Sequence, residues 1–564
     1  MSSEKVQPPA SSPDPSILPK VALDDMYEAD GSIDAVYQAK ARVLNNAIQE
    51  IGMGKYQVYL FICAGFGWFA DSVWPLITGL ILTPVVNEFK FNGPFLTLAA
   101  NVGLFVGAIV WSFGCDIWGR RWSFNLTLLI AGVFGLAAGG SQNMIALASL
   151  IATIGVGVGG NMPVDSAVFL DLVPGTHQWL LTVMSIWWCL GQLFVSLIAW
   201  PLITNFSCTS TTAACTRSEN MGWRYLLFTL GGITLVLWFI RFFIFRLYES
   251  PRYLIGIGKD AEAVRVINEI ARFNGKGTEE TGVLTVDDLR KAEEEVTFIG
   301  VQHLETEPGS RRVLSASSVL GWDHVKALFR TKQLALSTSL LISLWAIIGL
   351  ASTLYNSFLP FLLQSRGNAF GDGSLYITYR NTFILSIIGV PGAFLAGWAV
   401  ELPYVGRKGT LAISSGKLFG SESCFEHYST TTPALSLPFS FSLSTPSRIL
   451  YSCTRQGSPV PSSSLLPPRE APMLCSDGTV GTPSLIMYGV LYAISPEIFP
   501  AKDRGTGNGL VSSATRVFSI IAPIIAIYAN LETATPVYIS GALIILAGLL
   551  ALLLPFEPRG KASI

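Results

Sequence analysis

Two charged residues lie within apolar runs of this chain, where their chemistry could bind a solute or carry a proton. Asp71, in GFGWFADSVWPLITG, lies about 15 residues into its run, which is about 22 Å along a helix rising about 1.5 Å per residue. Arg516, in GLVSSATRVFSIIAP, lies about ten residues into another run. A charge near the centre of a lipid bilayer costs at least about 2.5 kcal/mol, so both residues call for an explanation.

Three interpretations of these two residues are open. An aspartate whose surroundings change between two states can take up and release a proton, and this would couple solute movement to a proton gradient. An arginine can hold an anionic solute in a fork of hydrogen bonds. The alternative is a static buried pair that stabilises packing alone.

Other polar residues in the apolar runs carry weaker hypotheses. Four uncharged residues could hydrogen-bond a polyol or a carboxylate, although such residues also bridge helices without touching a solute. These are Asn161, Gln192, Tyr355 and Asn356. We expect Trp187 and Trp188 to serve packing, and we expect Arg241 to extend to the lipid headgroups without a further role.

Composition excludes several classes of function. Half of the 564 residues are hydrophobic and 13% are charged, whereas soluble domains carry about 25% charged residues. The net charge of -1 disfavours nucleic acid as a partner. The eight cysteines form no CxxC pair, and the chain contains neither HExxH nor GxxxxGK[ST]. We therefore predict no metal, no cofactor and no enzymatic activity.

The elements that must position the polar residues are membrane-spanning helices, because about 20 apolar residues cross a bilayer as a helix. We expect an all-α membrane protein with twelve spans. The predicted spans begin near Tyr56, Pro94, Trp122, Met144, Trp179, Trp223, Ala335, Tyr376, Leu485, Gly507 and Pro536, with a truncated one at Gly409.

These spans divide the chain into five parts. We expect a disordered N-terminal tail, a first group of six helices, a soluble loop, a second group of six helices and a short tail. Their bounds are 1–55, 56–247, 248–334, 335–556 and 557–564. The loop contains one amphipathic helical stretch, KDAEAVRVINEIARFNG, which a glycine ends.

Lysine and arginine cluster at alternate ends of the spans, which predicts that both termini are cytoplasmic. The loop after Pro201, NFSCTSTTAACTRSEN, then lies outside the cell membrane. Asn205 stands in a glycosylation sequon, and Cys208 and Cys215 could form a disulfide in an oxidising compartment. Two free thiols are the alternative. We expect a multi-pass glycoprotein of the plasma membrane.

Two segments of the first half recur in the second half. GCDIWGRRWS at 114–123 is echoed by AVELPYVGRKGT at 399–410, each after the second span of its half. FLDLVPGTHQ at 169–178 is echoed by SPEIFPAKDRG at 495–505, each with an acid three residues before a proline. The two halves therefore resemble duplicates.

With these motifs, and with ESPRYL at 249–254, the chain resembles the major facilitator superfamily, in particular its sugar porter and synaptic-vesicle-protein branches. The resemblance implies two six-helix bundles around a central cavity, which exchange between inward-open and outward-open states. It places Asp71 and Arg516 on facing halves. It also implies a monomer in the lipid bilayer that moves a small organic solute, such as a sugar, an organic acid or another metabolite, together with protons.

The repeated motifs would then form gates at the cytoplasmic end, although the basic residues could instead only set topology. The gate residues of the first half are Asp116, Gly119, Arg120, Arg121 and Asp171. Their second-half counterparts are Glu401, Gly406, Arg407, Lys408 and Glu497.

Residues 417–483 depart from the family pattern. This segment is rich in serine, threonine and proline, contains no apolar run long enough to span a bilayer, and truncates the ninth and tenth spans. We interpret it as an error in the predicted coding sequence; a real insertion is the alternative. Besides a carrier, a solute sensor with a transporter fold and a non-functional product of a faulty gene model remain as functional alternatives.

Overall fold

The computed structural model describes most of the chain outside its ends and the anomalous segment. The described residues are 35–177, 179–208, 215–276, 282–303, 325–326, 328–358, 374–400, 406–415, 487–492, 494–495, 498–499, 504–528 and 535–555. The stretch 417–483 and the tail 557–564 lie outside them, as do residues 1–34. Among the described residues all regular elements are helical.

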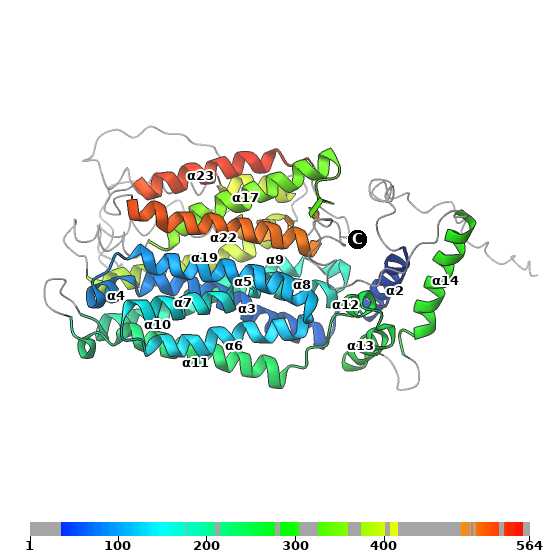
Figure 1. Ribbon diagram of the computed structural model, residues 1–564, viewed down its shortest axis with the longest axis horizontal. Helices are drawn as coiled ribbons and strands as arrows, with labels where there is room; N and C mark the ends of the chain where they lie inside the picture. Colours follow the sequence, from blue (N-terminus) through cyan, green and yellow to red (C-terminus); the bar gives the residue numbers. More distant parts are fainter. Residues whose placement is uncertain are drawn as a thin grey trace, which may run out of the picture.

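The first half forms a bundle of long apolar helices (Figure 1). They are α3 (Lys55–Leu80), α5 (Pro94–Ile117), α6 (Arg120–Gly139), α7 (Met144–Val158), α8 (Asn161–Leu172), α10 (Ser185–Phe206) and α11 (Gly222–Phe239), with α4 (Leu82–Phe89) continuing α3. The helix boundaries follow local chemistry: Pro94 occupies the first turn of α5, and the Asn143 side chain accepts a hydrogen bond from the Ala146 N–H at the start of α7. Six stretches between Lys55 and Ile244 are long and apolar enough to cross a membrane, which confirms the six predicted spans.

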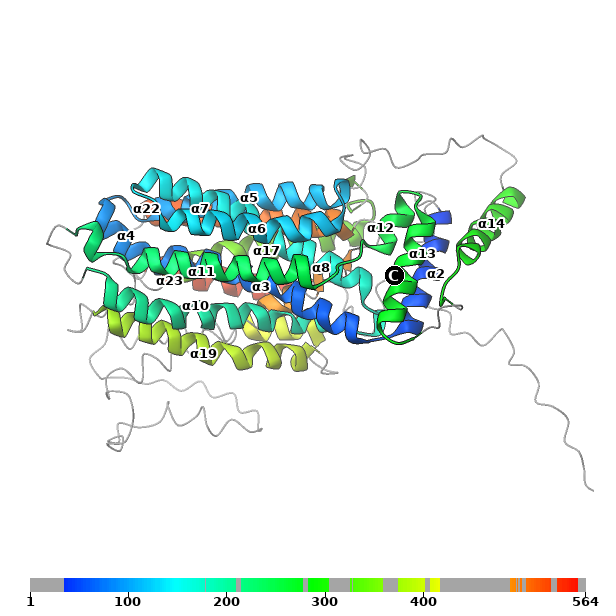
Figure 2. The same ribbon diagram turned by 90° about the horizontal axis from the view of Figure 1, so that it is seen from below.

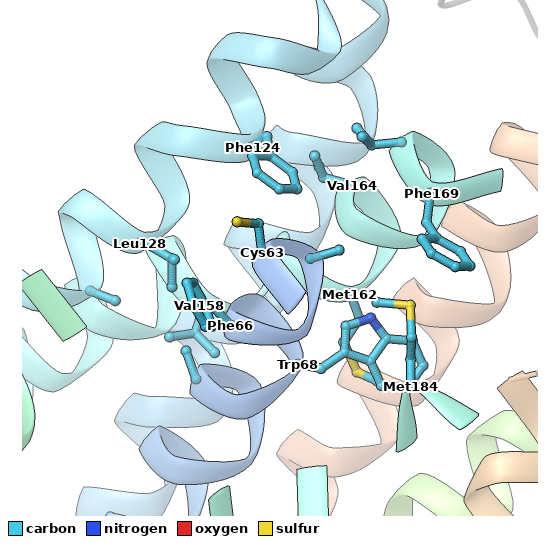
Figure 3. Packing of buried hydrophobic residues seen from close by; sticks show 14 of the residues in the cluster. Cys63, Phe66, Trp68, Phe124, Leu128, Val158, Met162, Val164, Phe169 and Met184 are labelled. Atoms are coloured by element: carbon cyan, nitrogen blue, oxygen red, sulfur yellow. The ribbon is translucent and has the colours of Figure 1, made fainter. Parts of the chain in front are cut away.

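Small residues let these helices approach closely. A methyl group at Gly155 of α7 would lie 2.8 Å from the Ala100 carbonyl oxygen of α5, so only glycine permits this packing. Figure 3 shows side chains of α3, α6, α7 and α8 filling the centre of the bundle, among them Trp68, Phe124 and Met162. The bundle core is thus continuous from one helix to the next.

The second half is described in part. Its helices are α17 (Lys332–Asn356), α19 (Leu375–Val400), α22 (Arg504–Tyr528) and α23 (Thr535–Leu552), and residues 406–415 are also helical. By length and composition, Lys332–Tyr355 and Gly507–Tyr528 could span a membrane, and Ile539–Leu552 is a shorter apolar helix. The described residues therefore contain eight such spans, and the number twelve stays a prediction.

The two halves lie side by side (Figures 1 and 2). Helix α22 contacts α5, and α19 contacts α10. The Ser196 and Ser386 hydroxyls are 3.1 Å apart, and the Tyr379 hydroxyl donates a hydrogen bond to the Leu80 carbonyl oxygen. These contacts join α10 to α19 and α3 to α19.

Four helices form a layer across one end of the bundle, here called the end layer: α2 (Ala35–Ile51), α12 (Pro251–Gly256), α13 (Asp260–Phe273) and α14 (Val286–His303) (Figure 2). Helix α13 confirms the predicted amphipathic helix. Helix α2 corrects our expectation that the whole tail up to residue 55 is disordered. Its side chains Leu44, Ile48 and Ile51 are buried, and Lys40 forms ion pairs with Asp260 at 2.6 Å and Glu293 at 2.8 Å.

Candidate functional site

The ion pair between Asp71 and Arg516 crosses from one half to the other. Asp71 lies on α3 and Arg516 on α22, and an Arg516 Nη2 to Asp71 Oδ1 hydrogen bond of 3.2 Å joins them. The exposed fractions of the side chains are 4% and 15%, so the pair is largely removed from solvent. The two residues singled out by their charges are therefore in direct contact, 445 positions apart in the chain.

Asp71 and Arg516 line a cavity between the halves with a free volume of about 120 Å³. Helices α3, α5 and α10 contribute one side of its lining, and α17 and α22 contribute the other. Most of its polar lining residues carry a hydroxyl or an amide group. They are Ser72, Thr78, Thr97, Asn101, Gln192, Ser352, Thr353, Ser357, Ser512, Thr515 and Ser519.

Aromatic rings form a second part of the wall. Tyr492 is their centre: its ring centroid lies 4.5 Å from that of Trp345, 5.2 Å from that of Trp68 and 6.1 Å from that of Trp188. Tyr488 contacts Trp188 at 5.1 Å. All of these except Trp68 line the cavity. Trp188, which we expected to serve packing, thus also faces the cavity, whereas Trp187 packs against aromatic rings of α3.

Of the uncharged residues predicted to bind a solute, one lines the cavity and the others are not among its described lining residues. Gln192 lines the cavity. Asn161 is fully buried at the start of α8 and Tyr355 is half-buried on α17, and neither is among the described lining residues. The side chain of Asn356 lies outside the described residues.

At the end of the bundle near the end layer, the turn between α5 and α6 holds a cluster of charged contacts. Gly119 has a φ of +90°, and a methyl group on it would lie 2.7 Å from a Glu249 carboxylate oxygen, so glycine is required. Arg120 forms an ion pair with Asp171 at the end of α8. The Ser250 hydroxyl donates a hydrogen bond of 2.6 Å to the same carboxylate.

Glu249 caps the first turn of α6. Its carboxylate accepts hydrogen bonds from the backbone N–H groups of Arg120 at 2.9 Å and Arg121 at 3.3 Å, where the helix dipole favours a negative charge. Arg252 lies 3.9 Å from Asp171 and donates to the Asn45 side chain of α2 at 2.6 Å. We predicted no role for these ESPR residues beyond the family resemblance, although their position after the sixth span was a usable signal.

The counterpart cluster of the second half is described in part. Gly406 has a φ of +58°, Arg407 is buried and Lys408 is half-buried. Glu401 and Glu497 lie outside the described residues, as does the side chain of Asp116 in the first half.

A second buried ion pair lies inside the first bundle. Asp165 of α8 and Arg241 form an ion pair, and the exposed fraction of both side chains is 0%. Arg241 belongs to a π-helical turn, Ile240–Ile244, and its guanidinium group lies over the Phe124 ring. Our expectation that Arg241 extends to the headgroups was wrong, because this turn directs it into the bundle. No motif drew attention to Asp165.

A third ion pair lies at the opposite end of the first bundle. Glu88 at the end of α4 contacts Arg224 at 2.6 Å and also accepts hydrogen bonds from Trp223 and Asn220. Burial alone would raise the pKa of Glu88, but the hydrogen bonds from Arg224 and Trp223 outweigh burial and lower it.

The loop after α10 carries the other sequence-predicted features. Asn205 is exposed near the end of α10, and Cys208 is joined to Cys215 in a disulfide.

A multi-helix membrane protein with a small polar cavity between two halves, and charged contacts at one end, has the architecture of a membrane transporter. The chain belongs to the Major Facilitator Superfamily, whose family model matches residues 59–457. Our prediction of this family is confirmed.

Known proteins agree with this assignment. The chain is 60% identical to MFS siderochrome iron transporter 1 of Ceriporiopsis subvermispora over 96% of this chain and 94% of that protein. It is 22% identical to the synaptic vesicle 2-related protein of Xenopus laevis over 92% of this chain and 82% of that protein, as expected for the predicted branch. Its fold is similar to that of the proton:xylose symporter XylE, with a TM-score of 0.60 at 15% identity over 90% of this chain and 98% of that one.

Proposed function

We propose that this transporter is a proton-coupled carrier of a small organic solute that works by alternating access, with Asp71 as the proton-binding group. The observation that carries the proposal is the Asp71–Arg516 ion pair at the wall of the cavity. The pair joins α3 of one half to α22 of the other, and alternating access moves one half against the other. A proton on Asp71 would weaken the pair, and a solute on Arg516 would replace it.

The charged cluster around Arg120, Asp171 and Glu249 supports the gating part of the proposal. It ties the turn after α5 to the end of α8 and to the segment after α11, so it holds three parts of the first half together at one end. We place this end in the cytoplasm, together with both termini, because the basic residues cluster here. The disulfide and Asn205 then face the outside of the plasma membrane.

The decisive test is solute uptake into transporter-deficient cells with and without a proton uncoupler. The panel contains labelled sugars, organic acids, organic cations and a ferric siderochrome, the last because of the name that the relative from Ceriporiopsis subvermispora carries. We expect movement of one solute class to collapse with the uncoupler. Binding without movement in either direction would instead favour a solute sensor.

Asp71→Asn sharpens the test of the coupling role. We expect this variant to lose uphill accumulation by at least about tenfold while still exchanging solute across the membrane, because it cannot release a proton. Asp71→Glu keeps the titrating group and serves as the matched control, with partial accumulation expected. Uphill uptake with unchanged pH dependence in Asp71→Asn would show that Asp71 does not couple transport to protons.

A further inference from the structure

The cavity offers its hydrogen-bond donors very unevenly. Several of its hydroxyl groups already donate to acceptors within the protein: Ser72 to Phe69 O, Thr78 to Pro75 O, Thr353 to Ser519 Oγ, Thr515 to Trp345 O and Ser519 to Gly349 O. These oxygens can still accept hydrogen bonds but have no proton left to donate. Donors to a solute must therefore come from Arg516 and from other lining groups, such as the Thr97 hydroxyl and the Gln192 amide.

Arg516 is the one cationic donor among the described residues that line the cavity. Among the described residues it donates one hydrogen bond, to Asp71, although a guanidinium group has five N–H donors in a fork that fits a carboxylate. Its side chain is 15% exposed, toward the cavity that it lines. One carboxylate can therefore bind at this point.

The ring-lined part of the wall adjoins this donor. Tyr488 and Tyr492 line the same cavity as Asp71 and Arg516, and the two tyrosine rings are stacked, with centroids 6.5 Å apart and an interplanar angle of 28°. Trp188 and Trp345 flank them. Flat aromatic surfaces beside a carboxylate-binding group fit a solute that has a planar ring next to its acid group.

The free volume limits the size of that solute. An apolar cavity of about 150 Å³ holds one benzene molecule, and the present cavity measures about 120 Å³. Pockets for drug-sized ligands are larger, about 300–1,000 Å³. One ring is therefore the upper limit for the free volume, and the acid group of the solute must take the place of Asp71 beside Arg516.

From these observations we propose that the solute is a single-ring aromatic monocarboxylate, bound by Arg516 and by the rings around Tyr492, and that about one proton enters with it on Asp71. This inference rests on the proposed carrier function. The Asp71–Arg516 pair is neutral, so an added anion would leave one uncompensated charge in the cavity. A proton from the same solution, bound to the Asp71 carboxylate, cancels that charge while the solute carboxylate takes over Arg516.

The test is binding to the purified full-length protein in detergent, because benzoic acid itself diffuses through membranes. Benzoate is the probe; cyclohexanecarboxylate has the acid without the planar ring, and benzamide has the ring without the charge. We expect benzoate to bind at least about tenfold more tightly than either control. Equal affinity for cyclohexanecarboxylate would overturn the aromatic part, and equal affinity for benzamide would overturn the role of the carboxylate.

Two pairs of variants separate the groups involved. Tyr492→Leu should weaken benzoate several-fold and leave cyclohexanecarboxylate nearly unchanged, whereas Tyr492→Phe should retain both affinities. Arg516→Lys keeps the charge but loses the fork, and we expect at least about a tenfold loss of benzoate affinity with an unchanged melting temperature. Unchanged benzoate affinity in Arg516→Lys, or an equal loss for both acids in Tyr492→Leu at an unchanged melting temperature, would contradict the proposal.

Proton uptake on binding is the second readout. In weakly buffered solution we expect about one proton to be taken up per benzoate bound, and none by Asp71→Asn at saturating benzoate. If the unaltered protein took up no proton when benzoate binds, the claim that a proton enters together with the solute would be wrong. If benzoate fails to bind while a sugar, a cation or a siderochrome is taken up and responds to the uncoupler, this inference is wrong and the proposed carrier function stands. If no solute moves with a proton, the proposed function itself fails.

Discussion

In the described residues, the contacts that join helices within the first half differ from those that join α17 to α22 in the second. In the first half, three ion pairs lie at successive depths: Arg120–Asp171 at one end, Asp165–Arg241 inside the bundle and Glu88–Arg224 at the other end. In the described part of the second half, hydroxyl groups join α17 to α22, as in the Thr353–Ser519 hydrogen bond of 3.0 Å. Its charged residue in the cavity, Arg516, pairs across to the first half.

This difference suggests how the halves share the work of transport. Buried ion pairs have strict geometry, so they favour a bundle that moves as one rigid body. Hydroxyl contacts between membrane helices are weak, about 0.6 kcal/mol each, and allow small sliding movements. We therefore expect the first half to act as the rigid frame and the helices α17 and α22 to make the local adjustments around a bound solute.

The largest expected effect comes from breaking the pair inside the first bundle. Asp165→Leu leaves Arg241 as a buried, uncompensated charge, and we expect a loss of about 3–5 kcal/mol in the free energy of unfolding. The measurement is thermal unfolding of the purified protein in detergent. The double variant Asp165→Leu with Arg241→Met removes both charges and should recover most of the loss. Equal destabilisation by the single and double variants would contradict a frame built on this pair.

The second-largest effect is expected when acid weakens the Glu88–Arg224 pair. Because the folded protein lowers the pKa of Glu88, its contribution to stability is present above the unfolded pKa of about 4.3 and is lost as the pH falls through the lower folded value. We expect the melting temperature to fall between about pH 5 and pH 3. Glu88→Gln should reduce this fall in melting temperature. Glu219→Gln, which changes another acid at the same end, is the control and should show the full fall. If the melting temperature of Glu88→Gln depended on pH as that of the unaltered protein does, Glu88 would not be the source of the acid sensitivity.

A smaller effect is expected at the cap of α6. Glu249→Gln keeps the shape of the side chain but removes the charge from the helix N-terminus, which should cost about 0.5–1 kcal/mol of stability. We also expect a cysteine introduced near this end to react faster with a hydrophilic thiol reagent, because the cluster opens more often. Glu262→Gln, on the exposed face of α13, is the matched control and should change neither quantity.

The smallest effect is expected in the second half. Thr353→Val removes the hydroxyl contact between α17 and α22 and should cost only about 0.6 kcal/mol. Thr229→Val removes a hydroxyl that bonds within its own helix on an exposed face and should cost less. If Thr353→Val lowered the free energy of unfolding as much as Asp165→Leu does, the proposed difference between the two halves would be wrong.

Much of the fold could be predicted because apolar runs and basic clusters are local signals. Asp71 and Arg516 stood out because a charge in an apolar run is costly. The resemblance to the major facilitator superfamily implied that their helices face each other. The Asp165–Arg241 pair could not be predicted, since it depends on a π-helical turn that redirects one side chain. Asn161 shows the reverse: a polar residue in a span can be fully buried without lining the cavity.

The position of α2 has a consequence for the order in which the protein is made. Lys40 of this helix pairs with Asp260 and Glu293, which follow it by more than 200 residues. A ribosome adds about 5–20 residues per second, so α2 leaves it on the order of tens of seconds before its partners exist. During that time the apolar side chains Leu44, Ile48 and Ile51 have no end layer to cover them. The end layer can therefore be completed only after Glu293 has been synthesised, later than all six spans of the first half.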